Sequence, residues 1–122
     1  MTLTRRLVAF SLPVLLLAGP ANAHHGWRWT ADGRFELTGI ITGARLGNPH
    51  GVLTIDAEGE IWQAEVGQPW RNERAGLSDA MLAPGTEVTI IGKRAADPEK
   101  RLVKAEAVRI AGQLYELYPE RL

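Results

Sequence analysis

The residues of this sequence best suited to chemistry are its three histidines, which lie in two short stretches. His24 and His25 stand in "ANAHHGWRW" (21–29), and His50 ends "GNPH". Nitrogen ligands in a near-planar arrangement favour Cu(II), which also has the highest affinity among the divalent first-row metals. In a chain that begins at His24, the α-amine, the His24 Nδ1 atom and a second imidazole form a three-nitrogen set known as a histidine brace. The sequence therefore predicts copper as a cofactor, with His24, His25 and His50 as its ligands.

The residues before His24 indicate that it becomes the first residue of the mature protein. Residues 1–23 combine two early arginines, a short apolar run and the small-x-small end "ANA", which is the pattern of a cleavable secretory signal. The apolar run is shorter than the roughly 20 residues that span a bilayer. We expect cleavage after Ala23, export to the periplasm and no membrane anchor afterwards. The alternative is an uncleaved N-terminal anchor.

Two other interpretations of the histidines stay open. With His25 at the second position of the mature chain, its imidazole, the intervening peptide nitrogen and the α-amine chelate copper without His50. The α-amine titrates near 8 and imidazole near 6.5, so both bind metal at periplasmic pH. In the other interpretation no metal is bound: the two N-terminal histidines form a tail without function, and His50 bonds to a carbonyl of its own loop.

Distance is the main difficulty for a site that includes His50. A strand over 34–45 spans roughly 35 Å at about 3.3 Å per residue, and His50 follows its far end. The segment "TADGR" (30–34) has the composition of a turn, so residues 24–29 can double back along this first strand. A partner subunit that supplies the third histidine is the other solution.

Composition bounds the remaining function classes. The chain has 14 basic and 14 acidic residues, and loss of Arg5 and Arg6 with the signal leaves 12 against 14, a formal net charge of −2. This charge gives no electrostatic reason to bind nucleic acid. The sequence shows no serine-nucleophile or phosphate-loop motif. An oxidative enzyme with a histidine brace needs a shaped substrate surface, for which the 99 residues after the signal leave little room, so we expect no enzyme. Glu36 and Glu65 are predicted to lie on solvated sheet faces.

The mature chain has the pattern of five strands. Apolar and polar residues alternate with the period of two that is typical of strands, over residues 34–46, 51–57, 60–66, 86–94 and 101–110. Gly39 and Gly43 suit a strand that bends around a barrel corner, and a short turn with a glycine joins the second strand to the third. Leu53, Ile55 and Trp62 are expected in the core.

A helix separates the third strand from the fourth. Pro69 suits a first helical turn and Gly76 a helix end, and Ser78 can cap a further short turn. This order predicts a mainly β fold: a small five-stranded OB-like barrel with one short helix between strands 3 and 4. A small antiparallel sandwich is the competing architecture. The predicted division is a signal peptide (1–23), an N-terminal segment (24–33), the barrel domain (34–112) and a C-terminal tail (113–122) that packs back.

Four motifs in one order carry a resemblance to a known family. They are "HHGW", "LTGIITGARLGNPHGVLTI", the tryptophan of the third strand and "LAPGTEVTIIGKRA". Together they resemble a family of small exported bacterial proteins catalogued as a domain of unknown function, with paired histidines after the signal and an Asn-Pro-His loop. The resemblance implies a periplasmic setting and a small β-fold, and it supplies no activity.

Two functions from different classes follow. The first is a small periplasmic copper carrier, buffer or accessory chaperone that uses His24, His25 and His50. The alternative is a metal-free module that binds a periplasmic protein or a cell-envelope glycan, through its barrel face or through Trp27 and Trp29. The other role of Trp27 and Trp29, and the expected one, is to pack against the barrel. The sequence does not define the oligomeric state.

Overall fold

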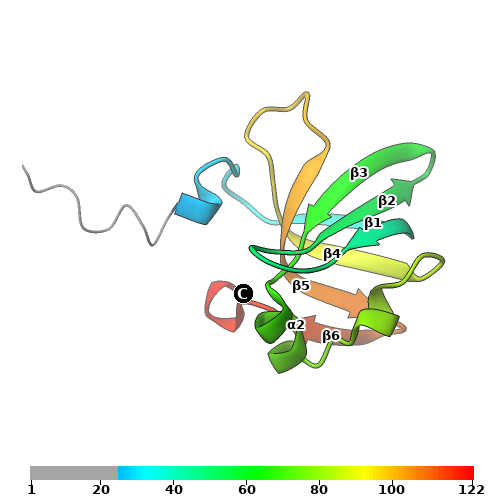
Figure 1. The fold of residues 1–122 in the computed structure, drawn as a ribbon. Coiled ribbons are helices and arrows are strands. Elements are labelled where there is room, and N and C mark those ends of the chain that lie inside the picture. The colour runs from blue at the N-terminus through cyan, green and yellow to red at the C-terminus, as the bar shows by residue number, and fades with distance from the viewer. Residues whose placement is uncertain (1–24) are drawn as a thin grey trace, which may run out of the picture.

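The computed structural model describes residues 25–122, and its centre is a closed barrel of five strands (Figure 1). The predicted signal peptide, its cleavage site and His24 lie outside these residues. The barrel strands are β1 (Phe35–Arg45), β2 (Val52–Ala57), β3 (Glu60–Glu65), β4 (Glu87–Arg94) and β5 (Leu102–Ile110). All five predicted strands are therefore confirmed, and none of their ends differs from the predicted one by more than one residue.

Neighbouring strands pair in the order β3-β2-β1-β4-β5, and a β3–β5 pairing closes the ring. Four of the pairings are antiparallel, while β3 and β5 run parallel over three register pairs. Five strands closed in this way, with a helix between the third and the fourth, form an OB-like barrel. The fold class predicted from the sequence is confirmed, and the sandwich alternative is wrong.

The bend of β1 occurs where the sequence places its glycines. The register between β1 and β2 shifts between Ile41 and Gly43, and such a bulge bends a strand. At Gly39 an added Cβ atom would lie 2.5 Å from the Asp56 carbonyl oxygen, so only glycine lets β2 approach this closely. The bend allows a single long strand to pair with β4 along its first half and with β2 along its second.

The core fills the barrel with the inward-facing residues of every strand. Leu53 and Ile55 are fully buried and Trp62 is 6% exposed, as the alternation predicts. Phe35 stacks on Trp62 with ring centroids 5.3 Å apart. The other buried apolar residues include Leu37, Ile41, Ala64, Val66, Leu77, Leu82, Val88, Ile90, Val103, Ala105, Val108 and Leu117.

The helix α2 (Pro69–Ala75) begins at Pro69, as predicted, and ends at Gly76, whose φ of 95° is the left-handed conformation that favours glycine. The short 3-10 helix η3 (Asp79–Leu82) follows, and the Ser78 hydroxyl accepts a hydrogen bond from the Met81 N–H. No helix of residues 25–122 is long and apolar enough to span a membrane.

The C-terminal tail has more structure than predicted. A sixth strand, β6 (Gln113–Glu116), pairs antiparallel with the edge of β5, and the 3-10 helix η4 (Pro119–Arg121) ends the chain. Leu117 is buried, as expected of a tail that packs back, whereas Leu114 is 42% exposed. The tail therefore extends the sheet and brings η4 back to the barrel.

Candidate functional site

His50 lies in the β1–β2 loop, and its Nε2 atom is 3.1 Å from Oε2 of Glu65. The loop is held by hydrogen bonds from the Gly51 N–H to the Gly67 carbonyl and from the Val66 N–H to the Gly51 carbonyl. A Cβ atom at Gly51 would lie 2.9 Å from side-chain carbons of Leu46 and Val66, so a larger residue here would have to displace these side chains. The His50 side chain is 38% exposed, and that of Glu65 is 12% exposed. One interpretation of the sequence had His50 bonded to a carbonyl of its own loop, whereas its ring contacts the Glu65 carboxylate.

Glu65 is not on a solvated face, and that prediction is wrong. Its second oxygen, Oε1, is 2.5 Å from Nζ of Lys104, whose side chain is 9% exposed. Glu65 and Lys104 are register partners in the parallel β3–β5 pairing. Because a buried charge requires a partner, the two groups depend on each other. Glu65 therefore connects Lys104 on one side to His50 on the other.

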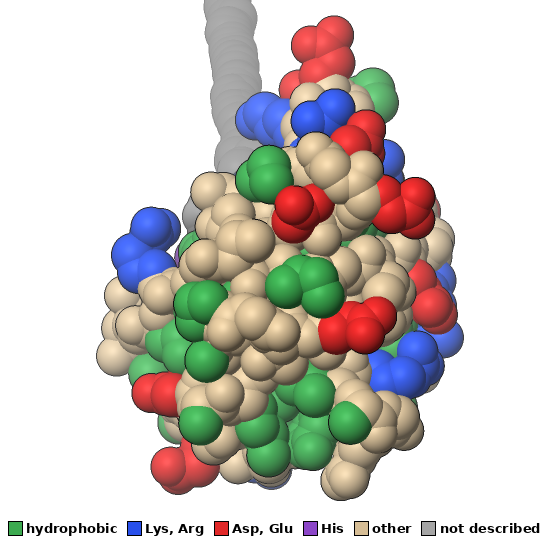
Figure 2. Space-filling model, turned by 90° about the vertical axis from the view of Figure 1, so that its right-hand side faces the viewer, with side chains coloured by type: hydrophobic (Ala, Val, Ile, Leu, Met, Phe, Trp, Pro, Cys, Tyr) green, Lys and Arg blue, Asp and Glu red, His purple; other side chains and the backbone are tan. Residues whose placement is uncertain are grey.

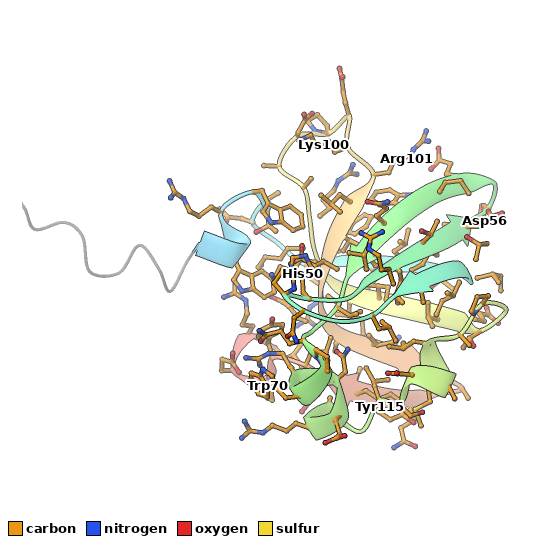
Figure 3. All side chains as sticks on the ribbon, in the orientation of Figure 1. His50, Asp56, Trp70, Lys100, Arg101 and Tyr115 are labelled. Atoms are coloured by element: carbon orange, nitrogen blue, oxygen red, sulfur yellow. The ribbon has the colours of Figure 1, made fainter. Side chains whose placement is uncertain are left out.

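The N-terminal segment reaches the same end of the barrel. It begins with the 3-10 helix η2 (His25–Trp27), and a Cβ atom added at Gly26 would be 3.3 Å from Nζ of Lys104. The same ammonium lies 4.9 Å from the centre of the Trp27 ring. Figure 3 shows His50 at the end of the barrel that faces η2, with Asp56 at the opposite end.

The route of the segment differs from the predicted one. Instead of doubling back along β1, Thr30 forms an antiparallel bridge with Ala95, just beyond β4. The Ala31 N–H donates to the Arg94 carbonyl and the Ala96 N–H to the Trp29 carbonyl. The Gly26 backbone therefore lies beside Lys104, which contacts Glu65, which contacts His50. The long separation between the N-terminal segment and His50 that the sequence predicted is not found up to Gly26. The His25 side chain, like His24, lies outside the described part of the chain.

Trp27 fixes the segment to the C-terminal tail. The Arg121 guanidinium lies 3.8 Å from the centre of the Trp27 ring, and Tyr118 meets the same ring edge-on at 5.1 Å. Arg121 in turn pairs with Glu106, which is 2% exposed, at 3.2 Å. Trp27 therefore packs against the barrel, as expected, and the tail is what holds it there.

Tyr118 is held from its other side by α2. Arg71 lies 4.0 Å from the Tyr118 ring centre, and its Nη1 atom donates to the Leu117 carbonyl. Burial raises the pKa of the Tyr118 hydroxyl above its usual range, and the nearby Arg71 guanidinium opposes part of that rise. The support under Trp27 thus comes from the C-terminal tail, from β5 and from α2.

A pocket of about 520 Å³ shares Glu65 as part of its wall. Trp29 and Leu102 give it an apolar surface, and Asp97 and Lys100 come from the β4–β5 loop. In OB-folds the β1–β2 and β4–β5 loops frame the ligand site. Trp29 thus lines a pocket beside the β4–β5 loop, while Trp27 packs on the tail.

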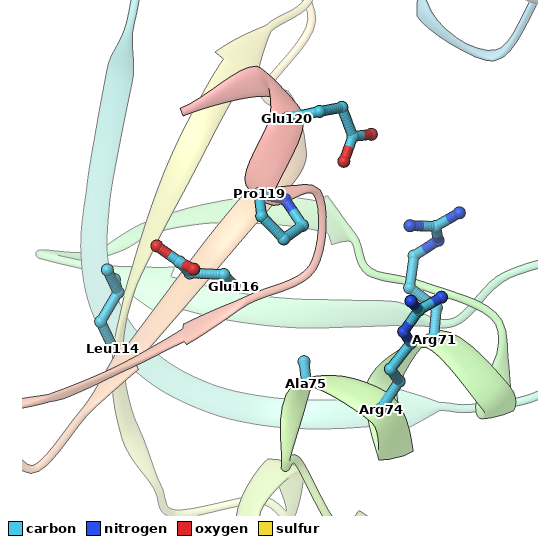
Figure 4. A pocket seen from close by; sticks show the side chains of 7 residues that line it. All are labelled: Arg71, Arg74, Ala75, Leu114, Glu116, Pro119 and Glu120. Carbon is cyan, nitrogen blue, oxygen red and sulfur yellow. The ribbon is translucent and has the colours of Figure 1, made fainter.

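Two other surfaces have mixed character. Between α2 and β6, a pocket of about 490 Å³ sets Arg71 and Arg74 opposite Glu116 and Glu120 (Figure 4). On the face shown in Figure 2, acidic, basic and hydrophobic side chains are interspersed. Neither surface presents one sign of charge.

The ligand chemistry at His50 is one imidazole nitrogen beside one carboxylate oxygen. Within residues 25–122, no three His, Cys, Asp or Glu side chains gather closely enough to hold a metal ion. The sequence identified His50 and gave no signal for Glu65 or Lys104 as its neighbours.

Solved structures similar to this chain share its fold. The S. pombe Stn1-Ten1 complex matches with a TM-score of 0.50 and 18% identity, over 66% of this chain and 59% of that one. A ZRD-deleted mutant of TiaS in complex with agmatine gives a TM-score of 0.51 and 18% identity, over 69% and 26%. Asparaginyl-tRNA synthetase from Pyrococcus horikoshii gives 0.51 and 19%, over 73% and 22%.

The chain thus spans about three fifths of the first of these proteins and about a quarter or less of the other two. At these identities the similarity describes the barrel and no more. No match was found among curated proteins. A family model described as "Family of unknown function" matches residues 12–103, which is most of the sequence, so this chain belongs to the DUF6152 family.

Proposed function

We propose that the mature protein binds one Cu(II) ion with His24, His25 and His50, and that it serves as a periplasmic copper carrier, buffer or accessory chaperone. It acts as a binding protein and not as an enzyme. One observation carries the proposal: the backbone at Gly26 lies beside Lys104, which is bonded to Glu65, which in turn contacts His50. His24 lies two residues before Gly26, and cleavage after Ala23 would make it the first residue, with a free α-amine beside its imidazole.

The donor set suits copper better than the other divalent metals. Imidazole and amine nitrogens in a near-planar arrangement favour Cu(II), and the predicted export signal supports a periplasmic protein with a free α-amine at His24. Because the ligands must lose their protons, affinity falls as the pH drops below about 6.

The test compares mature protein that starts at His24 with the same protein carrying one extra residue before it. The extension displaces the α-amine and leaves all three imidazoles in place. Titration against a chromophoric chelator should show one Cu(II) per chain, bound much more tightly by the native form. His50→Ala should weaken binding further; unchanged binding would remove His50 from the ligand set.

The second candidate is the metal-free module, and the pocket beside Trp29 favours it. An aromatic wall with a carboxylate at its edge can stack on a sugar ring and accept hydrogen bonds from its hydroxyls, and OB-folds bind oligosaccharides in this region. Equal copper affinity in the native, extended and His50→Ala proteins would reject the copper proposal. Trp29→Ala, assayed for binding to cell-envelope glycan fragments, then tests the module.

A further inference from the structure

We propose that Glu65 is the oxygen ligand of the metal site, and that Lys104 is a tethered cation that competes with the metal for it. This inference rests on the proposed function, because it names further residues of the same site. It starts from the placement of Glu65, whose two oxygens face two different partners: His50 at 3.1 Å and Lys104 at 2.5 Å.

The distance between the His50 and Glu65 donors suits one metal ion. Nitrogen and carboxylate oxygen bind divalent metals at roughly 2.0–2.2 Å, and two such ligands at a right angle are therefore roughly 2.9 Å apart. The observed separation of Nε2 and Oε2 is 3.1 Å. A metal ion can thus bind both atoms with little movement of either side chain.

Glu65 is also held in one orientation before any ion arrives. Its side chain and that of Lys104 are 12% and 9% exposed, and the backbone fixes both, since they are register partners where β3 meets β5. A ligand oriented by a neighbouring hydrogen bond is the usual arrangement around protein metal sites. Lys104 therefore acts as a positioning residue for the Glu65 carboxylate.

The charge of Lys104 has the opposite effect on affinity. Its ammonium lies against the Gly26 backbone and over Trp27, between the N-terminal segment and Glu65. A positive charge this close repels an incoming Cu(II) ion, and screening by water is weak because the group is mostly buried. Lys104 thus makes the site weaker than its donors alone would, which suits a protein that must release its metal.

The experiment measures Cu(II) affinity and the electron paramagnetic resonance spectrum of the mature protein. Glu65→Gln keeps the shape and removes the charge, and should lower affinity about tenfold or more and change the copper hyperfine pattern as an oxygen ligand is lost. Glu60→Gln is the matched control, because Glu60 lies on the same strand in an exposed pair with Arg101. It should change neither readout.

Lys104 is tested by two substitutions. Lys104→Met keeps the stem without the charge and should raise affinity about tenfold, whereas Lys104→Arg should stay near the native value. In the Glu65→Gln background, Lys104→Met should raise affinity by less, because the carboxylate for which the two cations compete is gone. Circular dichroism confirms folding, and the Lys104 pair tests the competition if Glu65→Gln does not fold.

Two results would overturn the inference, and they differ from failure of the proposed function. Tight binding by the native protein with the same affinity and spectrum in Glu65→Gln would exclude Glu65 as a ligand. Unchanged affinity in Lys104→Met would exclude the competition. By contrast, equal weak binding by native and N-terminally extended protein would reject the copper site itself.

Discussion

Replacement of Trp27 by alanine should separate the N-terminal segment from the barrel and weaken copper binding without unfolding the protein. Trp27 is held by the Arg121 guanidinium at 3.8 Å and by the edge of Tyr118 at 5.1 Å. A cation–π contact of this kind contributes about 0.5–2 kcal/mol, and an aromatic pair about 0.5–1.5 kcal/mol. The docking of the segment therefore loses about 1–3.5 kcal/mol, or about 5-fold to 300-fold in its equilibrium constant.

The apparent Cu(II) affinity should fall by up to the same factor, because the ion needs the docked segment to bring the N-terminus to His50. Competition with a chelator of known affinity measures it. Trp70→Ala is the matched control: Trp70 is 49% exposed and also lies near an arginine, Arg71, at 4.6 Å, but it is on α2. Native affinity in Trp27→Ala would refute the role of docking, as would an equal loss in Trp70→Ala.

Four further predictions concern export, folding and pH. N-terminal sequencing of protein from a periplasmic fraction should begin at His24; full-length chain in the membrane fraction alone would contradict this. Trp62→Ala should lower the free energy of unfolding by about 3–5 kcal/mol in denaturant titrations, and unchanged stability would contradict its core position. Gly92→Ala should destabilise by about 1–3 kcal/mol or more, since the new Cβ atom would meet the Lys104 carbonyl oxygen; a native melting temperature would contradict it. The raised pKa of Tyr118 means that the unfolded chain loses this proton first, so stability should fall as the pH rises past about 10, and less so in Tyr118→Phe.

The barrel could be predicted because its signals are local. Alternation placed Leu53, Ile55 and Trp62 inside, and Pro69 and Gly76 marked the two ends of α2. Each of these depends on residues within one element, so a single sequence contains the information.

The sixth strand could not be predicted in the same way. β6 has four residues, and the turn before it uses Ala111 with a positive φ of 51°, a conformation for which alanine gives no signal. It is a strand because the edge of β5 offers unpaired backbone groups. Such a partner is a property of the folded barrel.

The site was half predictable for a related reason. His50 stood out by its residue type, but alternation assigns Glu65 and Lys104 to the outward face of their strands. They are buried because η2 and the β1–β2 loop cover that face, and they meet because the parallel pairing aligns residues 39 positions apart. Pairing between strands that are not adjacent in sequence is the information that alternation lacks.

The β3–β5 seam has a consequence for how the barrel opens. It has three register pairs, the fewest of the five seams that close the ring, and Glu65 with Lys104 forms the last of them. Transient opening of a structure starts where the fewest contacts hold it, so amide hydrogens along this seam should exchange with solvent before those of β1 and β4. An ion bound at Glu65 would stabilise the same seam and slow that exchange. The rate of amide hydrogen exchange along this seam would then depend on whether the site is occupied, with no change in the average structure.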